Sequence, residues 1–171
     1  MCGIFGAVSS KNIQGVLVDG LMKLEYRGYD SAGLSVNSND NSLKCLRCVG
    51  KVKELKKLLS KSKISGSCGI AHTRWATHGI PNIKNSHPHN YGNISIVHNG
   101  IIENFEELRL TLTKSGHKFS SETDSEVIVH LIAACMSEKR TILAAITMAL
   151  KKLKGSFALG IISKDYPDII A

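Results

Sequence analysis

Met1-Cys2-Gly3-Ile4-Phe5-Gly6-Ala7-Val8 is the stretch around which the rest of the chain is organised. Residues 3–8 are apolar enough to predict a short buried strand directly after Cys2. If Met1 is removed, Cys2 carries a thiol and a free α-amine on adjacent carbons. An α-amine has a reference pKa of about 7.7–8.0, so near pH 7 it can accept the thiol proton. The position predicts a nucleophile with its own base, against the alternative of a buried cysteine that only packs.

The composition is typical of a soluble globular protein of about one domain. The chain has 171 residues, of which 43% are hydrophobic and 21% are charged, which is ordinary for a globular domain. No apolar stretch is long enough to cross a membrane. The residues before Lys11 lack the charge and the apolar core of a secretory signal. We therefore expect a cytoplasmic protein without membrane association.

The positive charge of the chain is concentrated in one segment. The net charge is +8, from 22 basic and 14 acidic residues. Basic side chains gather at residues 44–63 among leucines, and aromatic residues, only 5% of the chain, do not interleave with them. This pattern favours a solvated face of an amphipathic helix, so we expect no nucleic-acid partner. The alternative, a nucleic-acid-binding module that uses Lys51–Lys63, predicts binding that weakens with salt.

The cysteines do not form an obvious disulfide or metal framework. They are five in number, at positions 2, 45, 48, 68 and 135, and an odd count argues against a set of disulfides. Cys45-x-x-Cys48 has no second pair of its kind, and its flanks look like a strand. The alternative is a small metal-binding domain that combines this pair with His87 and His89. We expect no metal and no cofactor.

Hydrophobic periodicity divides the chain into hairpin-like groups of strands and separate groups of helices. The predicted strands are 3–8, 32–36, 43–49, 68–73, 94–98 and 157–162, with another beginning at 168. The predicted helices are 12–24, 51–61, one from 104, 123–136 and 141–153, and residues 76–93 form a long loop. In 51–61 the inward residues are Val52, Leu55, Leu58 and Leu59. This grouping predicts an α+β layered sandwich of antiparallel sheet covered by helices.

Capping patterns locate two of these helix starts. Asn104 is followed three residues later by Glu107, and Thr123 by Glu126. A hydroxyl or amide side chain with a glutamate three residues on is the capping-box pattern. We expect helices to begin at both places.

Three loop segments carry residues suited to chemistry. Arg74 stands where a strand ends and can pair with a carboxylate, with Thr77 and His78 adding hydrogen bonds, or it can be a surface arginine packed against Trp75. Asn99-Gly100 offers two donors that could meet at one oxyanion, or a type I′ hairpin turn. Asp124 could bind an ammonium group, or only favour the start of a helix.

Taken together, these segments resemble the glutaminase domain of class II glutamine amidotransferases, a branch of the N-terminal-nucleophile hydrolases. The opening Met1-Cys2-Gly3-Ile4 is shared in type across that branch. Other segments closely resemble the members that pass ammonia to fructose 6-phosphate: Leu24-Glu25-Tyr26-Arg27-Gly28-Tyr29-Asp30-Ser31-Ala32-Gly33, Ala71 to Gly79, Ser86-His87-Pro88-His89, His98 to Glu103 and Ser121-Glu122-Thr123-Asp124. The resemblance runs essentially from Cys2 to Ala171.

The resemblance implies a four-layer αββα sandwich and a set of roles for the hydrolysis of L-glutamine. Cys2 would attack the side-chain amide carbon, with its α-amine as base, to form a thioester. Asn99 and the Gly100 N–H would hold the oxyanion. The remaining roles concern the substrate: Arg74 would pair with its α-carboxylate and Asp124 with its α-ammonium, Thr77, His78 and the backbone near Trp75 would complete the pocket, and Trp75 would gate the passage of ammonia.

The resemblance also implies what the whole enzyme contains. Residues 2–171 would be a glutaminase domain that lacks its C-terminal part, since the apolar run Ile169-Ile170-Ala171 stops inside an expected strand. The sugar-isomerase domains that bind fructose 6-phosphate are not in this sequence. With them, the enzyme would be a homo-oligomer that makes glucosamine 6-phosphate in hexosamine biosynthesis. The alternative within the family is a class II amidotransferase with a different acceptor.

Overall fold

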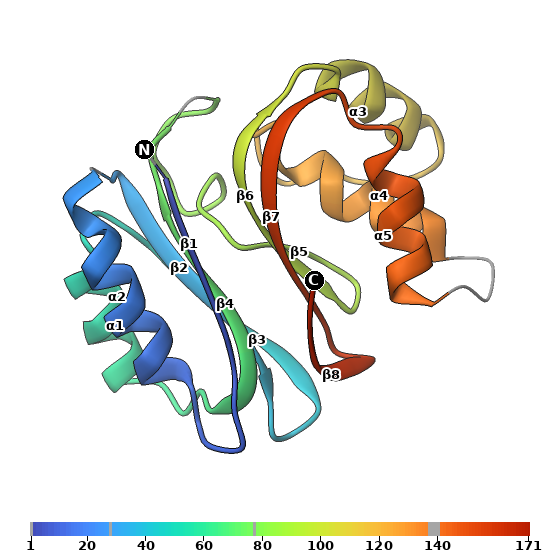
Figure 1. The fold of residues 1–171 in the computed structure, drawn as a ribbon. Coiled ribbons are helices and arrows are strands. Elements are labelled where there is room, and N and C mark those ends of the chain that lie inside the picture. The colour runs from blue at the N-terminus through green and yellow to red at the C-terminus, as the bar shows by residue number, and fades with distance from the viewer. Residues whose placement is uncertain (1, 28, 77, 137–140) are drawn as a thin grey trace.

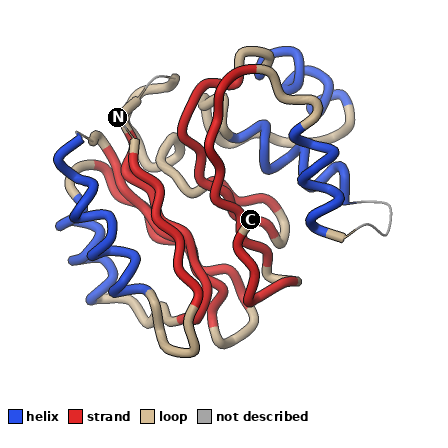
Figure 2. The backbone as a smooth tube through the Cα atoms, in the orientation of Figure 1, coloured by secondary structure: helices blue, strands red, loops and turns tan. Residues whose placement is uncertain are grey.

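Strands that are apolar on both faces must be buried on both sides. In this chain they are buried in a four-layer arrangement of two sheets and two groups of helices. The computed structural model describes residues 2–27, 29–76, 78–136 and 141–171. Figure 1 and Figure 2 show two sheets face to face, with helices on the outer face of each. The predicted αββα sandwich is therefore confirmed.

The first sheet is antiparallel and has the order β1-β4-β2-β3. Its strands are β1 (Gly3–Val8), β2 (Ser31–Ser38), β3 (Ser42–Val49) and β4 (Gly66–Arg74). Helices α1 (Gln14–Leu24) and α2 (Val52–Ser60) cover its outer face, and a short 3-10 helix η1 (Glu25–Arg27) follows α1. The first residues of β1 therefore lie beside the last residues of β4, at the same end of the sheet.

The core of the first half lies between these two helices and their sheet. Leu17, Leu34 and Leu55 are fully buried there, and burial of each such side chain contributes about 1.5–3 kcal/mol. The expectation that Leu58 points inward is wrong, because Leu58 is 40% exposed. At 100° per residue, Val52 and Leu55 set the inward direction of α2, and Leu58 falls on the flank of the helix.

The second sheet has the order β5-β6-β7-β8 and is also antiparallel. Its strands are β5 (His89–Tyr91), β6 (Ile94–Ile102), β7 (Gly155–Ser163) and β8 (Tyr166–Ile170), and its helices are α3 (Phe105–Lys114), α4 (Glu126–Met136) and α5 (Ile142–Leu150). The predicted apolar face of residues 141–153 is buried against α4, which confirms that helix. The predicted loop 76–93 is only partly right, since it ends in β5.

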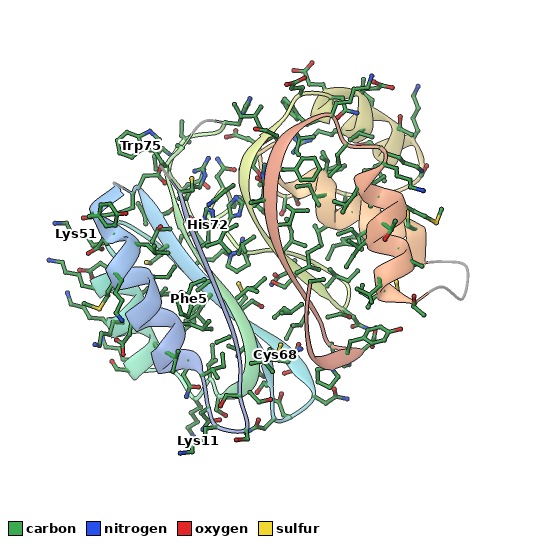
Figure 3. The ribbon with its side chains drawn as sticks, in the orientation of Figure 1. Phe5, Lys11, Lys51, Cys68, His72 and Trp75 are labelled. Carbon is green, nitrogen blue, oxygen red and sulfur yellow. The ribbon has the colours of Figure 1, made fainter. Side chains whose placement is uncertain are left out.

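The two sheets pack through small and branched side chains. Cys68 and Ile70 of β4 meet Val97 of β6 and Ile162 of β7. Figure 3 shows Cys68 and His72 pointing into the space between the sheets. The apolar contacts occupy the middle of this interface, and polar side chains occupy the end where β1 begins.

The hairpin of β2 and β3 separates the two cysteines of the Cys-x-x-Cys pair. Cys45 pairs with Ser35 and Cys48 with Ala32, so their side chains lie on opposite faces of the strand. Within the described ranges, no three His, Cys, Asp or Glu side chains are grouped so that they could hold a metal ion. No helix in the described part of the chain is long and apolar enough to traverse a bilayer.

The two predicted capping patterns are wrong in detail. Asn104 precedes α3, but its side chain bonds the backbone of Lys152 and Lys154 instead, at 2.9 Å each. The carboxylate of Glu126 accepts hydrogen bonds from the backbone and hydroxyls of Ser120 and Ser121. In both cases a tertiary contact competes successfully with the local cap.

Candidate active site

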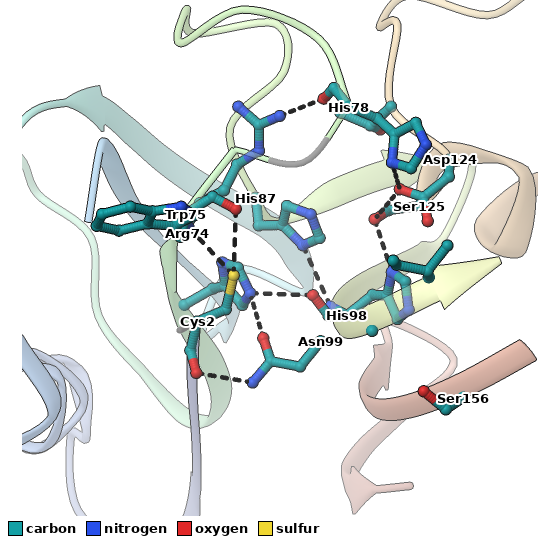
Figure 4. A pocket seen from close by; sticks show the side chains of 14 residues that line it. Cys2, Arg74, Trp75, His78, His87, His98, Asn99, Asp124, Ser125 and Ser156 are labelled. Carbon is teal, nitrogen blue, oxygen red and sulfur yellow. Dashed lines mark hydrogen bonds and ion pairs between the residues drawn. The ribbon is translucent and has the colours of Figure 1, made fainter. Parts of the chain in front are cut away.

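A cavity of about 590 Å³ opens at the polar end of the sheet interface (Figure 4). It lies where β1 begins and β4 ends, facing β6 of the second sheet. Its walls contain the following residues: Cys2, His72, Arg74, Trp75, His78, His87, His98, Asn99, Gly100, Ile101, Thr123, Asp124, Ser125 and Ser156. Seven of the eight residues proposed from the sequence are in this set. The eighth, Thr77, lies outside the described residues.

Strand pairing places Cys2 in the cavity. In the antiparallel register, Gly3 lies opposite Thr73, so Cys2 falls beside the end of β4. The Cys2 Sγ atom lies 3.1 Å from the backbone N of Trp75, which donates to it, and 3.6 Å from the carbonyl oxygen of the same residue. The thiol is half-buried.

Asn99 and Gly100 lie within β6, so the hairpin-turn alternative is wrong. Asn99 pairs with Ala158 and Gly100 with Phe157 of β7. The Asn99 Nδ2 donates to the backbone oxygen of Cys2 at 3.1 Å. Gly100 has a φ of +134°, and a Cβ at this position would stand 2.0 Å from the oxygen of Ser156. The close passage of β7 therefore requires glycine here.

Arg74 is buried at the cavity wall and holds the following loop in place. Its guanidinium donates to the carbonyl oxygens of His78 and Gly79, the latter at 3.0 Å. Its Nη1 lies 3.7 Å from Asp30 Oδ1 and makes no hydrogen bond within the described residues. Asp30 also accepts from the backbone of Ala76. The surface-arginine alternative is wrong, since Arg74 is only 4% exposed.

Asp124 faces the same cavity from the segment before α4. It is buried, and its Oδ2 accepts the backbone N–H of Ile102 at 2.9 Å. His78 Nδ1 lies 3.9 Å from Asp124 Oδ1. Trp75 stands at the rim and is 55% exposed. Figure 4 shows Arg74 and Asp124 on the wall across from Asn99.

The carboxylate of Glu126 anchors the segment that carries Asp124. It is 3% exposed and receives its shortest hydrogen bond, 2.6 Å, from Ser121 Oγ. Arg109 Nη2 and His130 Nε2 lie 3.9 and 3.6 Å from it. Burial raises the pKa of Glu126, but the bonds from His130, Ser121 and Ser120 outweigh burial and hold its pKa well below the usual range. The side chain is therefore ionised wherever the protein is folded near neutrality.

Three cavity histidines, His72, His87 and His98, were given no role in glutamine chemistry from the sequence, and His87 was considered only as a metal ligand. The rings of His72 and His87 stack at 4.1 Å between centroids. His98 Nδ1 lies 2.7 Å from Ser125 Oγ. The sequence did contain one signal for two of them. His72 and His98 are polar residues inside apolar strands, which is unusual unless the side chain has a hydrogen-bond partner.

Burial keeps these histidines neutral. It lowers the pKa of His72 to about 4 and that of His89 to about 3. Burial also holds the pKa of His87 well below its ordinary value, and the neighbouring His72 adds to this effect. Burial lowers the pKa of His98, although Asp124 opposes the shift. Near pH 7 these four histidines are therefore uncharged.

The arrangement suits a small zwitterion with a carbonyl at its far end. One wall offers a cation and an anion, Arg74 and Asp124, and the other a thiol beside the amide of Asn99. A nucleophile beside a preorganised donor is the arrangement for acyl transfer.

Comparisons with known proteins agree with this chemistry. The family model described as "Glutamine amidotransferase domain" matches residues 72–171. The chain is 52% identical over 168 residues to the glutamine–fructose-6-phosphate aminotransferase (isomerizing) of Acinetobacter baylyi, covering 98% of this chain and 27% of that one. Its identity to the enzyme of the same name from Buchnera aphidicola is 51%, with 98% and 28% covered. The chain thus spans about a quarter of the length of these relatives.

A solved structure shares the fold at lower identity. The glutamine phosphoribosylpyrophosphate amidotransferase of B. subtilis, in complex with ADP and GMP, superposes with a TM-score of 0.81 at 27% identity. The match covers 96% of this chain and 35% of that one. The likeness therefore extends over nearly all of the four layers.

Proposed function

This chain belongs to the glutamine amidotransferase domain family, and on that premise we propose that residues 2–171 hydrolyse the side-chain amide of L-glutamine to glutamate and ammonia. The observation that carries the proposal is the position of Cys2. Its thiol lies against the Trp75 N–H in the same cavity as the amide of Asn99 and the charges of Arg74 and Asp124.

The reaction begins with Cys2 after removal of Met1. The α-amine takes the thiol proton, and Sγ attacks the amide carbon of glutamine to form a tetrahedral oxyanion. The Asn99 Nδ2 and the Gly100 N–H stabilise this charge, a contribution of about 10²–10³ in kcat for one such donor. The intermediate collapses as the ammonium returns its proton to the leaving nitrogen. Ammonia departs, and water then hydrolyses the thioester to glutamate.

The charges across the cavity position the substrate. Arg74 provides the positive field for the α-carboxylate, and Asp124 accepts the α-ammonium. The carbonyls of residues 78 and 79 already bind the guanidinium, so Arg74 and its loop form one unit around the carboxylate. Thr77, His78 and the backbone at Trp75 would complete the pocket around the substrate.

In the longer protein, we propose that the ammonia reaches fructose 6-phosphate and yields glucosamine 6-phosphate. This extension rests on the name shared by relatives that are about 50% identical to the chain. The half-exposed indole of Trp75, at the cavity rim, would gate the passage of ammonia. Fructose 6-phosphate would bind domains outside residues 2–171, in a cytoplasmic homo-oligomer.

The test is glutamate release from glutamine by the purified protein. Cys2→Ala should abolish turnover while glutamate still binds, because the charges of Arg74 and Asp124 remain. Cys45→Ala is the matched control: Cys45 is another half-buried thiol, but it lies outside the cavity, so its loss should leave turnover within about 3-fold. Turnover retained in Cys2→Ala would overturn the proposal.

A further inference from the structure

The orientation of the Asn99 side chain depends on a second residue, and we propose that His72 is the positioning residue that turns the amide nitrogen of Asn99 toward Cys2. This inference rests on the proposed function, because Asn99 matters there as an oxyanion donor. His72 does not touch the reacting atoms in this account. It acts through the amide of Asn99.

The hydrogen bonds leave one arrangement of donors and acceptors. His72 Nε2 lies 2.8 Å from Asn99 Oδ1 and 3.0 Å from the backbone oxygen of His98. The backbone oxygen can only accept, so Nε2 must carry a proton. The same N–H of His72 then points at Oδ1 of Asn99. The Nδ2 of Asn99 is therefore free to donate to the backbone oxygen of Cys2, at 3.1 Å. Figure 4 shows the side chain of Asn99 directed toward Cys2.

The reversed amide would be doubly unfavourable. It would place the Asn99 NH₂ against the N–H of His72, and its oxygen against the oxygen of Cys2. Each contact would replace a hydrogen bond by a repulsion, and a buried group without its partner costs about 1–3 kcal/mol. The His72 N–H thus selects the orientation in which Asn99 offers a donor.

The imidazole of His72 is itself held rigidly. It is 1% exposed and stacks on His87 at 4.1 Å with an angle of 17° between the ring planes. His87 is fixed in turn, because its Nδ1 accepts the backbone N–H of His98 at 3.2 Å. His72 Nδ1 is buried and has no hydrogen-bond partner among the described residues. A neutral ring with its single proton on Nε2 satisfies all these contacts.

The expected kinetic effect is on turnover more than on binding. Without the His72 donor, part of the protein would hold Asn99 with its oxygen toward the developing charge. Complete loss of one oxyanion donor costs about 10²–10³ in kcat, so partial misorientation should cost about 10–100-fold. KM for glutamine should change less than about 3-fold, because uniform binding of the substrate is untouched.

A double-mutant cycle tests the coupling. His72→Phe keeps a buried ring and removes the donor, and it should lower kcat about 10–100-fold in the otherwise unchanged protein. In an Asn99→Ala background the same change should lower kcat less than about 3-fold, because the residue through which His72 acts is gone. His72→Gln, which retains a side-chain N–H, should recover part of the activity. Losses that multiply in the double variant would overturn the inference.

His89→Phe serves as the control for a general loss of stability. His89 is as deeply buried as His72 but bonds Thr123 Oγ1, at 3.1 Å, and does not line the cavity. Both variants should lower the unfolding temperature, and only His72→Phe should lower kcat. An equal fall in kcat for both variants would assign His72 a merely structural role.

The tautomer of His72 can be measured without relying on enzymatic activity. Ring ¹⁵N chemical shifts, assigned by comparison with His72→Gln, should show the proton on Nε2 and none on Nδ1. A proton on Nδ1 would overturn the inference even in a protein that proves inactive toward glutamine. Inactivity of the unchanged protein with the Nε2 tautomer present would refute the proposed function and leave the positioning of Asn99 intact.

Discussion

Replacing Gly100 by alanine tests whether β6 can pair closely with β7 only when residue 100 is glycine. The added Cβ would stand 2.0 Å from Ser156 O and 2.8 Å from Phe157 Cα. The first distance is roughly 1.3 Å shorter than a normal contact between carbon and a carbonyl oxygen, about 3.3 Å. Both neighbours are backbone atoms of β7, so no side-chain rotation can relieve the clash. The two strands must separate or the backbone must change.

The free-energy cost follows from three effects. Overpacking costs about 1–3 kcal/mol. A non-glycine residue at a φ of +134° adds about 1–3 kcal/mol of backbone strain. Each ladder hydrogen bond lost near the clash adds about 1 kcal/mol. We therefore expect Gly100→Ala to lower the free energy of unfolding by about 4 kcal/mol, a large part of the stability of a domain.

Urea unfolding followed by circular dichroism measures this change, with Gly116→Ala as the matched control. Gly116 also has a positive φ, +92°, but its added Cβ would meet no atom within 4 Å. It isolates the backbone strain, about 1 kcal/mol. The difference between the two variants is the steric effect. A Gly100→Ala protein within about 1 kcal/mol of Gly116→Ala, with turnover intact, would refute the reasoning.

Three further outcomes are expected. In the folded protein the pKa values of His72 and His89 are about 4 and about 3, below the ordinary 6.5. Their contribution to stability is therefore complete above pH 6.5 and should be lost as the pH falls from 6.5 toward these values, by about 1.4 kcal/mol per pH unit for each histidine. Unfolding free energies that stay flat between pH 6.5 and 4 would contradict this prediction. Glu126→Gln should destabilise the protein by about 3 kcal/mol in urea unfolding, because the buried donors around residue 126 lose their charged acceptor; a loss below about 1 kcal/mol would show that the anchor is unimportant. Gly15→Ala should stabilise the protein by about 0.5–1 kcal/mol, since Gly15 lies in α1 with open space around it, and a lower melting temperature would count against the helix assignment.

The layers of the fold were predictable because they follow periodicity. The apolar face of 141–153 has a period that only a helix satisfies, and the turn at 37–41 separates two strands that pair as expected. Leu58 was wrongly predicted to point inward, because residue spacing in a short helix does not determine whether a residue at the edge of the apolar face is buried. Local patterns failed where distant segments compete, as when Glu126 bonds Ser120 and Ser121 and not a cap.

The site was harder to predict from local sequence. Asn-Gly is the strongest hairpin signal, yet residues 99 and 100 continue β6 because β7 pairs alongside them. That partner is more than fifty residues away along the chain, so no local pattern reports it. The three cavity histidines could not be assigned for the same reason: each of their contacts joins two segments that are separate along the chain. Resemblance supplied the candidate roles, and the fold brought the described candidates into one cavity.

The central claim is that Cys2, as a free N-terminal residue, attacks glutamine. Rapid quenching of the protein with glutamine, followed by mass spectrometry of its N-terminal peptide, tests it most directly. We predict a glutamyl group attached to Cys2, found only on molecules from which Met1 has been removed. Turnover by molecules that retain Met1, or turnover without any adduct at Cys2 under conditions that trap thioesters, would contradict the account.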